Sequence, residues 1–262
     1  QEASTDCGSL WSAYYGFENN ILKRLEIMRE LNYSEEEIRQ YCKKNWKFSA
    51  VRGLEIEESL KEGKTEQAIA ILQESKELDR EYAGLVGKYS EKLIDLFEKQ
   101  QTWEAYKKEL LFYVFSCGQN DLTYINKLKE ICAEQEWNEY REQILKSSKG
   151  YQIRYLLMES EGLYERMIQS IQQEHSVHYL DQYEKLLKKK FPEQVRDIYA
   201  SYVCEQAARV SDRKRYKELM QYLKKIKTYA GGKEKAREIA EDWRTFYYRR
   251  SAMMDELRKA GF

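Results

Sequence analysis

Apolar residues recur at intervals of three and four along almost the whole chain, and this spacing constrains the fold more than any other feature. Two of the apolar stripes consist of Ile21, Leu22, Leu25, Met28 and Leu31 and of Leu219, Leu223, Ile226 and Tyr229. Such intervals place each stripe on one face of a helix, while the intervening Lys, Glu and Arg side chains face water. No convincing run of strict apolar–polar alternation indicates a strand. The sequence therefore predicts an all-α fold.

Helix start signals accompany these stripes. Ser34 stands three residues before Glu37, which is the arrangement of a capping box. Asp212 is placed to cap the helix that runs through Leu223. Pro192 suits the first turn of another helix, where its missing N–H costs nothing. These residues predict where three of the helices begin.

Short turns divide the chain into repeats. We expect them at residues 63–65, 101–103, 135–137, 161–163, 191–192, 211–212 and 231–232. The first intervals are about 35 residues, close to a tetratricopeptide helix pair, and the last are about 20. The best match to that repeat, without its full consensus, is formed by Leu60, Gly63, Ala68, Ile69 and Leu72. Because each helix pair leaves an apolar face that only a neighbour covers, we predict antiparallel helix hairpins stacked as a degenerate tetratricopeptide-like α-solenoid.

The repeats predict one elongated helical-repeat domain over residues 1–262, which could divide softly near residues 175–190. The chain begins with Gln1 rather than Met, so we expect a fragment of a longer protein. Charge is uneven, because residues 1–180 hold 24 Lys and Arg against 32 Asp and Glu, and residues 181–262 hold 21 against 13. The resulting net charges of −8 and +8 bear on the choice of partner.

Cysteine usage and hydropathy predict a cytoplasmic protein. The five cysteines are odd in number and widely scattered, whereas the disulfide framework of a secreted protein is even and dense. No apolar run approaches the roughly 20 residues that span a bilayer, and no signal segment is recognisable. We therefore expect reduced thiols and no membrane partner.

Motifs for catalysis, cofactors and metals are missing from the sequence. It contains no Gly-x-Ser-x-Gly elbow and no Gly-x-Gly-x-x-Gly loop. Residues 63–65 (Gly-Lys-Thr) resemble the end of a phosphate-binding loop, but Glu58 stands where that loop requires Gly. His175 and His178 lie three residues apart without a complete ligand set for Zn²⁺. We expect a protein that is not an enzyme and holds neither a cofactor nor a metal.

The last third of the chain is basic and aromatic, and it allows two interpretations. In the first, aromatic rings stack on the bases of a nucleic acid and cations neutralise its phosphates. The candidate phosphate contacts are Lys224, Lys225, Arg244, Arg249 and Arg250. In the second, a terminal helix docks through an apolar stripe formed by Trp243, Phe246, Tyr247, Arg250, Met254 and Leu257. We favour the second, because the aromatic residues repeat like a core face.

An ordered series of short segments in the last third carries a family resemblance. The segments are residues 191–192 (Phe-Pro), 195–199 (Val-Arg-Asp-Ile-Tyr), 209–214 (Arg-Val-Ser-Asp-Arg-Lys), 231–233 (Gly-Gly-Lys) and 249–257 (Arg-Arg-Ser-Ala-Met-Met-Asp-Glu-Leu). This series resembles the C-terminal helical region of long bacterial, Firmicutes-type proteins that carry a SWIM zinc finger near their N-terminus. The resemblance implies a C-terminal fragment of a protein that acts near DNA or protein partners. The Cys-x-Cys and Cys-x-His ligand pattern of that finger is absent, so no zinc site is implied here.

The function predicted from these features is a non-enzymatic scaffold for protein–protein interaction. Tyr and Trp side chains on inner helices would anchor a peptide or helix, with charged residues setting specificity. The sequence does not assign individual residues to that peptide-binding surface. The alternative is a nucleic-acid-binding module in the basic last third, and a third hypothesis is a structural spacer without a ligand.

Overall fold

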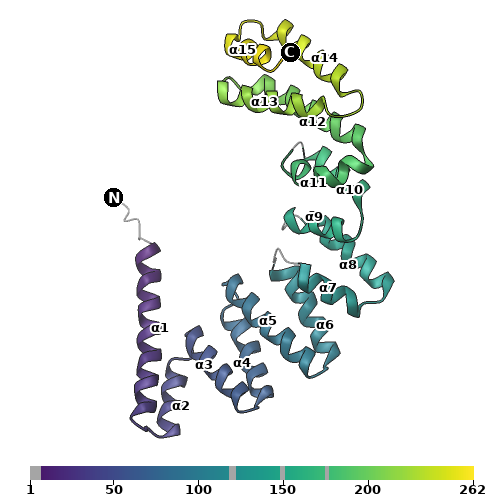
Figure 1. The fold of residues 1–262 in the computed structure, drawn as a ribbon. Coiled ribbons are helices and arrows are strands. Elements are labelled where there is room, and N and C mark those ends of the chain that lie inside the picture. The colour runs from purple at the N-terminus through teal and green to yellow at the C-terminus, as the bar shows by residue number, and fades with distance from the viewer. Residues whose placement is uncertain (1–6, 118–121, 148–150, 175–176) are drawn as a thin grey trace. The chain divides into compact units, whose positions relative to one another are not determined.

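The computed structural model describes residues 7–117, 122–147, 151–174 and 177–262, and over these residues the chain is all-helical (Figure 1). Fifteen α-helices and no strand are found in the described ranges, which confirms the all-α prediction. Contacts between residues divide the chain into two compact units, residues 1–150 and residues 151–262. Each unit is described by itself below.

The first unit consists of helices joined by short turns. Its described helices are α1 (Cys7–Glu30), α2 (Glu35–Lys44), α3 (Ser49–Lys61), α4 (Thr65–Leu78), α5 (Ala83–Lys99), α6 (Trp103–Phe112), α7 (Leu122–Ile131) and α8 (Glu134–Lys146). A π-helical turn, Tyr113–Cys117, continues α6. The predicted capping box is confirmed, because the Glu37 N–H donates to Ser34 Oγ and the Ser34 N–H donates to Glu37 Oε2.

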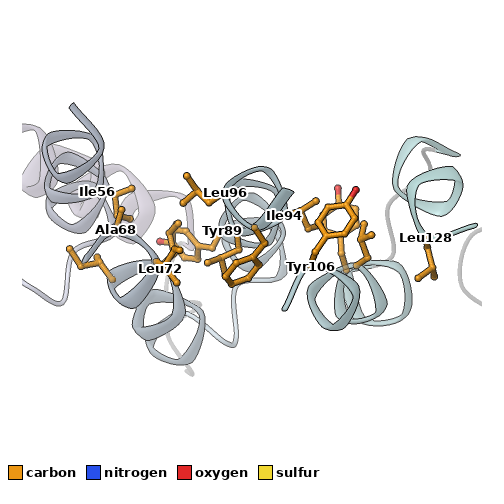
Figure 2. Close-up of a cluster of buried hydrophobic side chains, with 14 residues drawn as sticks. Ile56, Ala68, Leu72, Tyr89, Ile94, Leu96, Tyr106 and Leu128 are labelled. Atoms are coloured by element: carbon orange, nitrogen blue, oxygen red, sulfur yellow. The ribbon is translucent and has the colours of Figure 1, made fainter. Parts of the chain in front are cut away.

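Consecutive helices of the first unit pack on one another in chain order. The pairs α3–α4, α4–α5, α5–α6 and α6–α7 are all in contact, and α1 lies against α2 and α3. One apolar cluster runs through α3 to α7, as Figure 2 shows for Leu72, Tyr89 and Leu128. Leu72 and Leu128 are completely buried. The helical spacing of the apolar residues thus produces a continuous core that each helix shares with its neighbours.

A fully buried arginine links α3, α4 and α5. The Arg52 Nε donates to Ser75 Oγ over 3.0 Å, and Nη1 donates to the Trp46 carbonyl over 2.6 Å. Its Nη2 pairs with Asp79, which also accepts a hydrogen bond from the Tyr89 hydroxyl over 2.6 Å. Burying a guanidinium is costly unless it is paired and hydrogen-bonded, and these contacts meet that condition.

The second unit continues the same construction. Its described helices are α9 (Tyr151–Ser160), α10 (Tyr164–Gln173), α11 (Val177–Lys190), α12 (Pro192–Arg209), α13 (Arg213–Ile226), α14 (Gly232–Phe246) and α15 (Ser251–Lys259). Two predicted helix starts are confirmed, with Asp212 Oδ1 accepting from the Arg215 N–H and Pro192 at the first helical position. Gly231 takes the left-handed conformation, with a φ of 67°, between α13 and α14.

Helices of the second unit form two layers. Helix α12 contacts α10 and α14 in one layer, and α13 contacts α15 in the other. Helix α11 joins the second layer, because Lys225 of α13 forms ion pairs with its Asp181 and Glu184. Helices one and two places apart in the sequence are therefore neighbours, as expected for stacked helix hairpins.

Two details differ from the sequence prediction. The turn expected at residues 135–137 lies earlier, because α8 begins at Glu134 after Cys132 and Ala133. The stripe expected as one helix from Trp243 to Leu257 is broken into α14 and α15. The single elongated domain and its possible soft division near residues 175–190 stay predictions.

Candidate functional site

The five residues predicted to contact phosphate lie on three neighbouring segments of the second unit. Lys224 and Lys225 are near the end of α13, and Arg244 is in the last turn of α14. Arg249 and Arg250 follow in the connection to α15. Two of these cations, Lys225 and Arg250, have partners within the protein. The other three are exposed.

Lys225 is engaged by carboxylates. Its Nζ lies 2.7 Å from Asp181 Oδ1 and 2.9 Å from Glu184 Oε2. Asp181 also accepts hydrogen bonds from the hydroxyls of Tyr199, over 2.8 Å, and Tyr222, over 2.7 Å. Burial opposes ionisation of Asp181, but these donors outweigh it and lower the pKa of the carboxyl. The Lys225 charge is therefore compensated within the protein.

A third tyrosine hydroxyl extends these contacts. We call the whole set the tyrosine–carboxylate network (Asp181, Glu184, Tyr199, Tyr222, Lys225 and Tyr229). The Tyr229 hydroxyl donates to Glu184 Oε1 over 2.6 Å. Burial and the hydrogen bonds to carboxylates raise the pKa of Tyr199 and of Tyr229. The phenols stay neutral donors, and the network joins α11, α12 and α13.

Arg250 is the other structural cation. Its Nη1 donates to the carbonyls of Ala207, over 2.6 Å, and Val210, over 3.0 Å, at the end of α12. Its guanidinium also lies over the Tyr247 ring, 4.3 Å from the centroid. A cation that satisfies the last carbonyls of a helix stabilises that helix end, so Arg250 holds the α14–α15 connection against α12.

Lys224, Arg244 and Arg249 are exposed. The Arg249 Nε donates to the hydroxyl of the exposed Tyr248 over 2.9 Å. Among the aromatic residues of the predicted stripe, Trp243 is buried, whereas Phe246 is 73% exposed. The apolar stripe therefore divides, with Trp243 and Leu257 in the core and Phe246 facing solvent.

Arg244 also borders a basic depression that sequence reasoning missed. The depression has a volume of about 450 Å³ and is lined by Lys227, Lys233, Arg237 and Arg244, with Glu241 as the one acidic side chain. Lys233, Arg237 and Arg244 lie at intervals of four and seven on α14. This spacing was visible in the sequence, but the contribution of Lys227 required the packing of α13 against α14.

The first unit contains a groove of a different character, which we call the α2–α4 groove. It has a volume of about 460 Å³ and a mostly apolar lining. The residues that line it are Arg39, Cys42 and Lys43 of α2, Trp46, Glu55 of α3, and Gln67, Ala70, Ile71 and Glu74 of α4. The Trp46 Nε1 donates to Glu74 Oε1 over 3.0 Å, which holds the indole in place.

A carboxylate without a partner lies in this groove. Glu55 is half-buried, and among the described residues none pairs with its carboxylate or donates to it. Burial and the nearby Glu58 charge raise the pKa of Glu55. A half-buried carboxylate without a protein donor is available to a ligand that carries a cation.

The described residues offer little chemistry for catalysis or metal binding. Within the described ranges, no group of three or more His, Cys, Asp or Glu side chains is arranged to hold a metal ion. Burial raises the pKa of the thiols of Cys42, Cys117, Cys132 and Cys204, which weakens them as nucleophiles. His175 lies outside the described residues.

Comparison with known proteins gives no family for this chain. The sequence matches no protein-family model and no curated protein. Of the helices formed by the described residues, none is both long and apolar enough to cross a membrane.

Proposed function

We propose that this chain is a non-enzymatic helical-repeat scaffold whose first unit binds a short segment of a partner protein in the α2–α4 groove. The observation that carries the proposal is an open, mostly apolar groove with one unpartnered carboxylate in it. Ligand sites are typically concave and mostly apolar, with a few polar groups that fix orientation. The α2–α4 groove has this composition.

The size of the groove limits what it accepts. Its α4 wall runs from Gln67 to Glu74, which is about 10 Å at 1.5 Å per helical residue. That length matches roughly three residues of extended peptide, at about 3.3 Å each. A short extended segment therefore fits better than a long docked helix.

The side chains that line the groove indicate the composition of this segment. Trp46 and Ile71 offer apolar surface, and the fixed indole anchors a ligand at a low cost in conformational entropy. Glu55 offers a charged acceptor in a half-buried position. We expect an apolar residue next to a Lys or Arg, with the cation on Glu55.

Selection of peptides from a random displayed library on the full chain tests the proposal. Selected peptides are expected to share an apolar residue beside a Lys or Arg. Ala70 is exposed on the α4 wall, so Ala70→Arg fills the groove without touching the core. The variant is expected to bind the selected peptides at least roughly tenfold more weakly in calorimetric titration.

A matched control comes from the same unit. Ala83 is exposed at the first residue of α5 and outside the groove, so Ala83→Arg adds the same side chain elsewhere. This variant is expected to keep the wild-type affinity. Equal affinity of all three proteins for the selected peptides would contradict a site in the α2–α4 groove.

Glu55→Gln tests what the Glu55 charge contributes to binding while leaving the shape of the groove unchanged. The amide keeps the volume but removes the negative charge, so affinity for a basic peptide is expected to fall by about tenfold. Affinity for the same peptide with norleucine in place of its Lys or Arg is expected to stay unchanged. A uniform loss for both peptides would contradict the assigned role of Glu55.

The relation to SWIM zinc finger proteins, the bacterial origin and the tetratricopeptide-like label stay predictions from the sequence. They would give the scaffold a place at the C-terminal end of a longer protein that acts near DNA. The groove argument depends on none of them.

A further inference from the structure

Four cations in the second unit line one depression. They are Lys227, Lys233, Arg237 and Arg244, and among the described residues none of the four forms an ion pair with a carboxylate. Glu241 is the single acidic side chain of the lining. The four like charges repel one another, so an anionic ligand that neutralises them would be favoured.

Other cations of the same unit are paired. Lys225 has two carboxylate partners, and Arg213 has Asp255 and Glu256. Lys235, on the same helix as Lys233, pairs with Glu238 at 3.0 Å. In contrast to these three cations, the four that line the depression have no carboxylate partner among the described residues.

The arrangement is elongated. Lys233 and Arg244 are eleven residues apart on α14, which places them about 16 Å apart along the helix axis. Lys227 lies on the opposite wall, where its Nζ is 3.6 Å from the centroid of the half-buried Phe262 ring. A row of cations of this length suits several successive anionic groups better than one compact anion.

Two exposed aromatic rings lie at and just after the end of α14. Phe246 is 73% exposed, and Tyr248 is 61% exposed. Rings of this kind next to cations provide stacking platforms for unpaired bases. Residues 151–262 also carry a net charge of +6, from 23 Lys and Arg and 17 Asp and Glu, which favours approach of a polyanion.

We propose that the face formed by Lys227, Lys233, Arg237 and Arg244 binds the phosphate backbone of single-stranded nucleic acid, with the exposed Tyr248 beyond the end of α14 as a base-stacking position. Of the five contacts named from the sequence, this surface keeps Arg244. Lys225 and Arg250 are bonded within the protein, and Lys224 and Arg249 are exposed but do not line the depression. The site goes beyond the peptide-binding scaffold and shares no residue with the α2–α4 groove.

Fluorescence anisotropy of a labelled 20-nucleotide oligo(dT) with the full chain tests this site. Four phosphate contacts predict a slope of about −3 for log affinity against log salt concentration. Affinity is then expected to fall by about 50-fold between 50 and 200 mM salt. Arg237→Gln removes one contact, so the slope is expected to become shallower by about 0.7.

A charge-matched pair of variants separates the site from general attraction. Simultaneous Lys227→Glu, Lys233→Glu, Arg237→Glu and Arg244→Glu should abolish binding at 50 mM salt. The control changes four other cations of the unit, which are exposed and have no carboxylate partner among the described residues: Lys185, Lys189, Lys214 and Lys217, each to Glu. This control should retain most of the wild-type affinity, and circular dichroism should show both variants folded.

Three results would overturn the proposal. One is absence of oligo(dT) binding by the wild type at 50 mM salt, and another is an equal loss of affinity in the two fourfold variants. The third is displacement of oligo(dT) by an equal concentration of a polyglutamate peptide or a DNA duplex. That outcome would assign the face to an acidic protein or to double-stranded DNA instead.

Discussion

In both units, side-chain contacts link helices that are two places apart in the sequence, but the donors to the carboxylates differ. In the first unit Lys76 of α4 reaches Glu109 of α6 at 2.5 Å, and Lys107 of α6 reaches Glu136 of α8 at 2.6 Å. In the second unit α11 and α13 are tied by Lys225 together with the tyrosine hydroxyls of the tyrosine–carboxylate network. The helix packing is similar, but the donors differ.

The two units also differ in charge balance. Residues 1–150 carry 22 Lys and Arg against 28 Asp and Glu, and residues 151–262 carry 23 against 17. The lining of the α2–α4 groove holds two Glu, one Arg and one Lys, whereas the depression beside α14 is lined by four cations and one Glu.

The largest expected effect comes from removing the buried cation of the first unit. Arg52→Met leaves Asp79 buried at the junction of α3, α4 and α5 without its counter-ion. Breaking a buried pair in this way costs about 3–5 kcal/mol of unfolding free energy. Guanidinium unfolding followed by hydrogen exchange should show the loss in residues 7–117 first.

A double variant sharpens that result. Arg52→Met with Asp79→Leu removes both charges and should recover part of the lost stability, because no unpaired charge remains buried. A double variant that is less stable than Arg52→Met would show that the pair is not the source of the loss.

Alkaline pH should weaken both units through their tyrosines. Burial and the hydrogen bond to Asp79 raise the pKa of Tyr89 to about 12. A raised pKa means that the folded state holds the proton more tightly, so this contribution is complete below pH 10 and is lost between about pH 10 and 12. The loss from Tyr89 is of the order of 2 kcal/mol.

Tyr89→Phe tests this pH dependence. The variant should have a shallower decline of stability over that pH window in thermal melts, while it loses about 1 kcal/mol at neutral pH. An unchanged decline would assign the alkaline sensitivity to other groups.

A smaller effect is expected in the tyrosine–carboxylate network. Tyr199→Phe removes a buried hydroxyl that donates to Asp181 Oδ1 over 2.8 Å, at a cost of about 1–1.5 kcal/mol. Tyr222→Phe, at a more exposed position, should cost less. Urea unfolding followed at Trp243, the one tryptophan of residues 151–262, reports on both. A larger loss of stability in Tyr222→Phe than in Tyr199→Phe would contradict the expected dependence on burial.

The smallest effect on stability is expected from the Lys107–Glu136 ion pair. Both side chains are about one-third exposed, at 29% and 34%, so water screens their attraction. Lys107→Ala should cost no more than about 0.5 kcal/mol in the same unfolding measurement. A loss of unfolding free energy above about 2 kcal/mol would show that such ion pairs, rather than the apolar cluster, stabilise the first unit.

Local sequence signals predicted the fold well, but they did not locate the sites. Ser34, Asp212 and Pro192 mark helix starts because capping depends on residues within one turn. Lys225 and Arg250 looked like free cations because their partners, Asp181 and the Ala207 carbonyl, lie 44 and 43 residues away. Phe246 fitted the core stripe by spacing, but the helix break after it turned that side chain to solvent.

The central claim is that two surfaces of opposite character act separately, and a competition experiment tests it most directly. A labelled peptide selected on the wild-type chain is titrated with and without saturating oligo(dT). Because the α2–α4 groove and the basic face share no residue, the peptide dissociation constant should change by less than about twofold. Displacement of the peptide by oligo(dT) would contradict the account, since one surface would then serve both ligands.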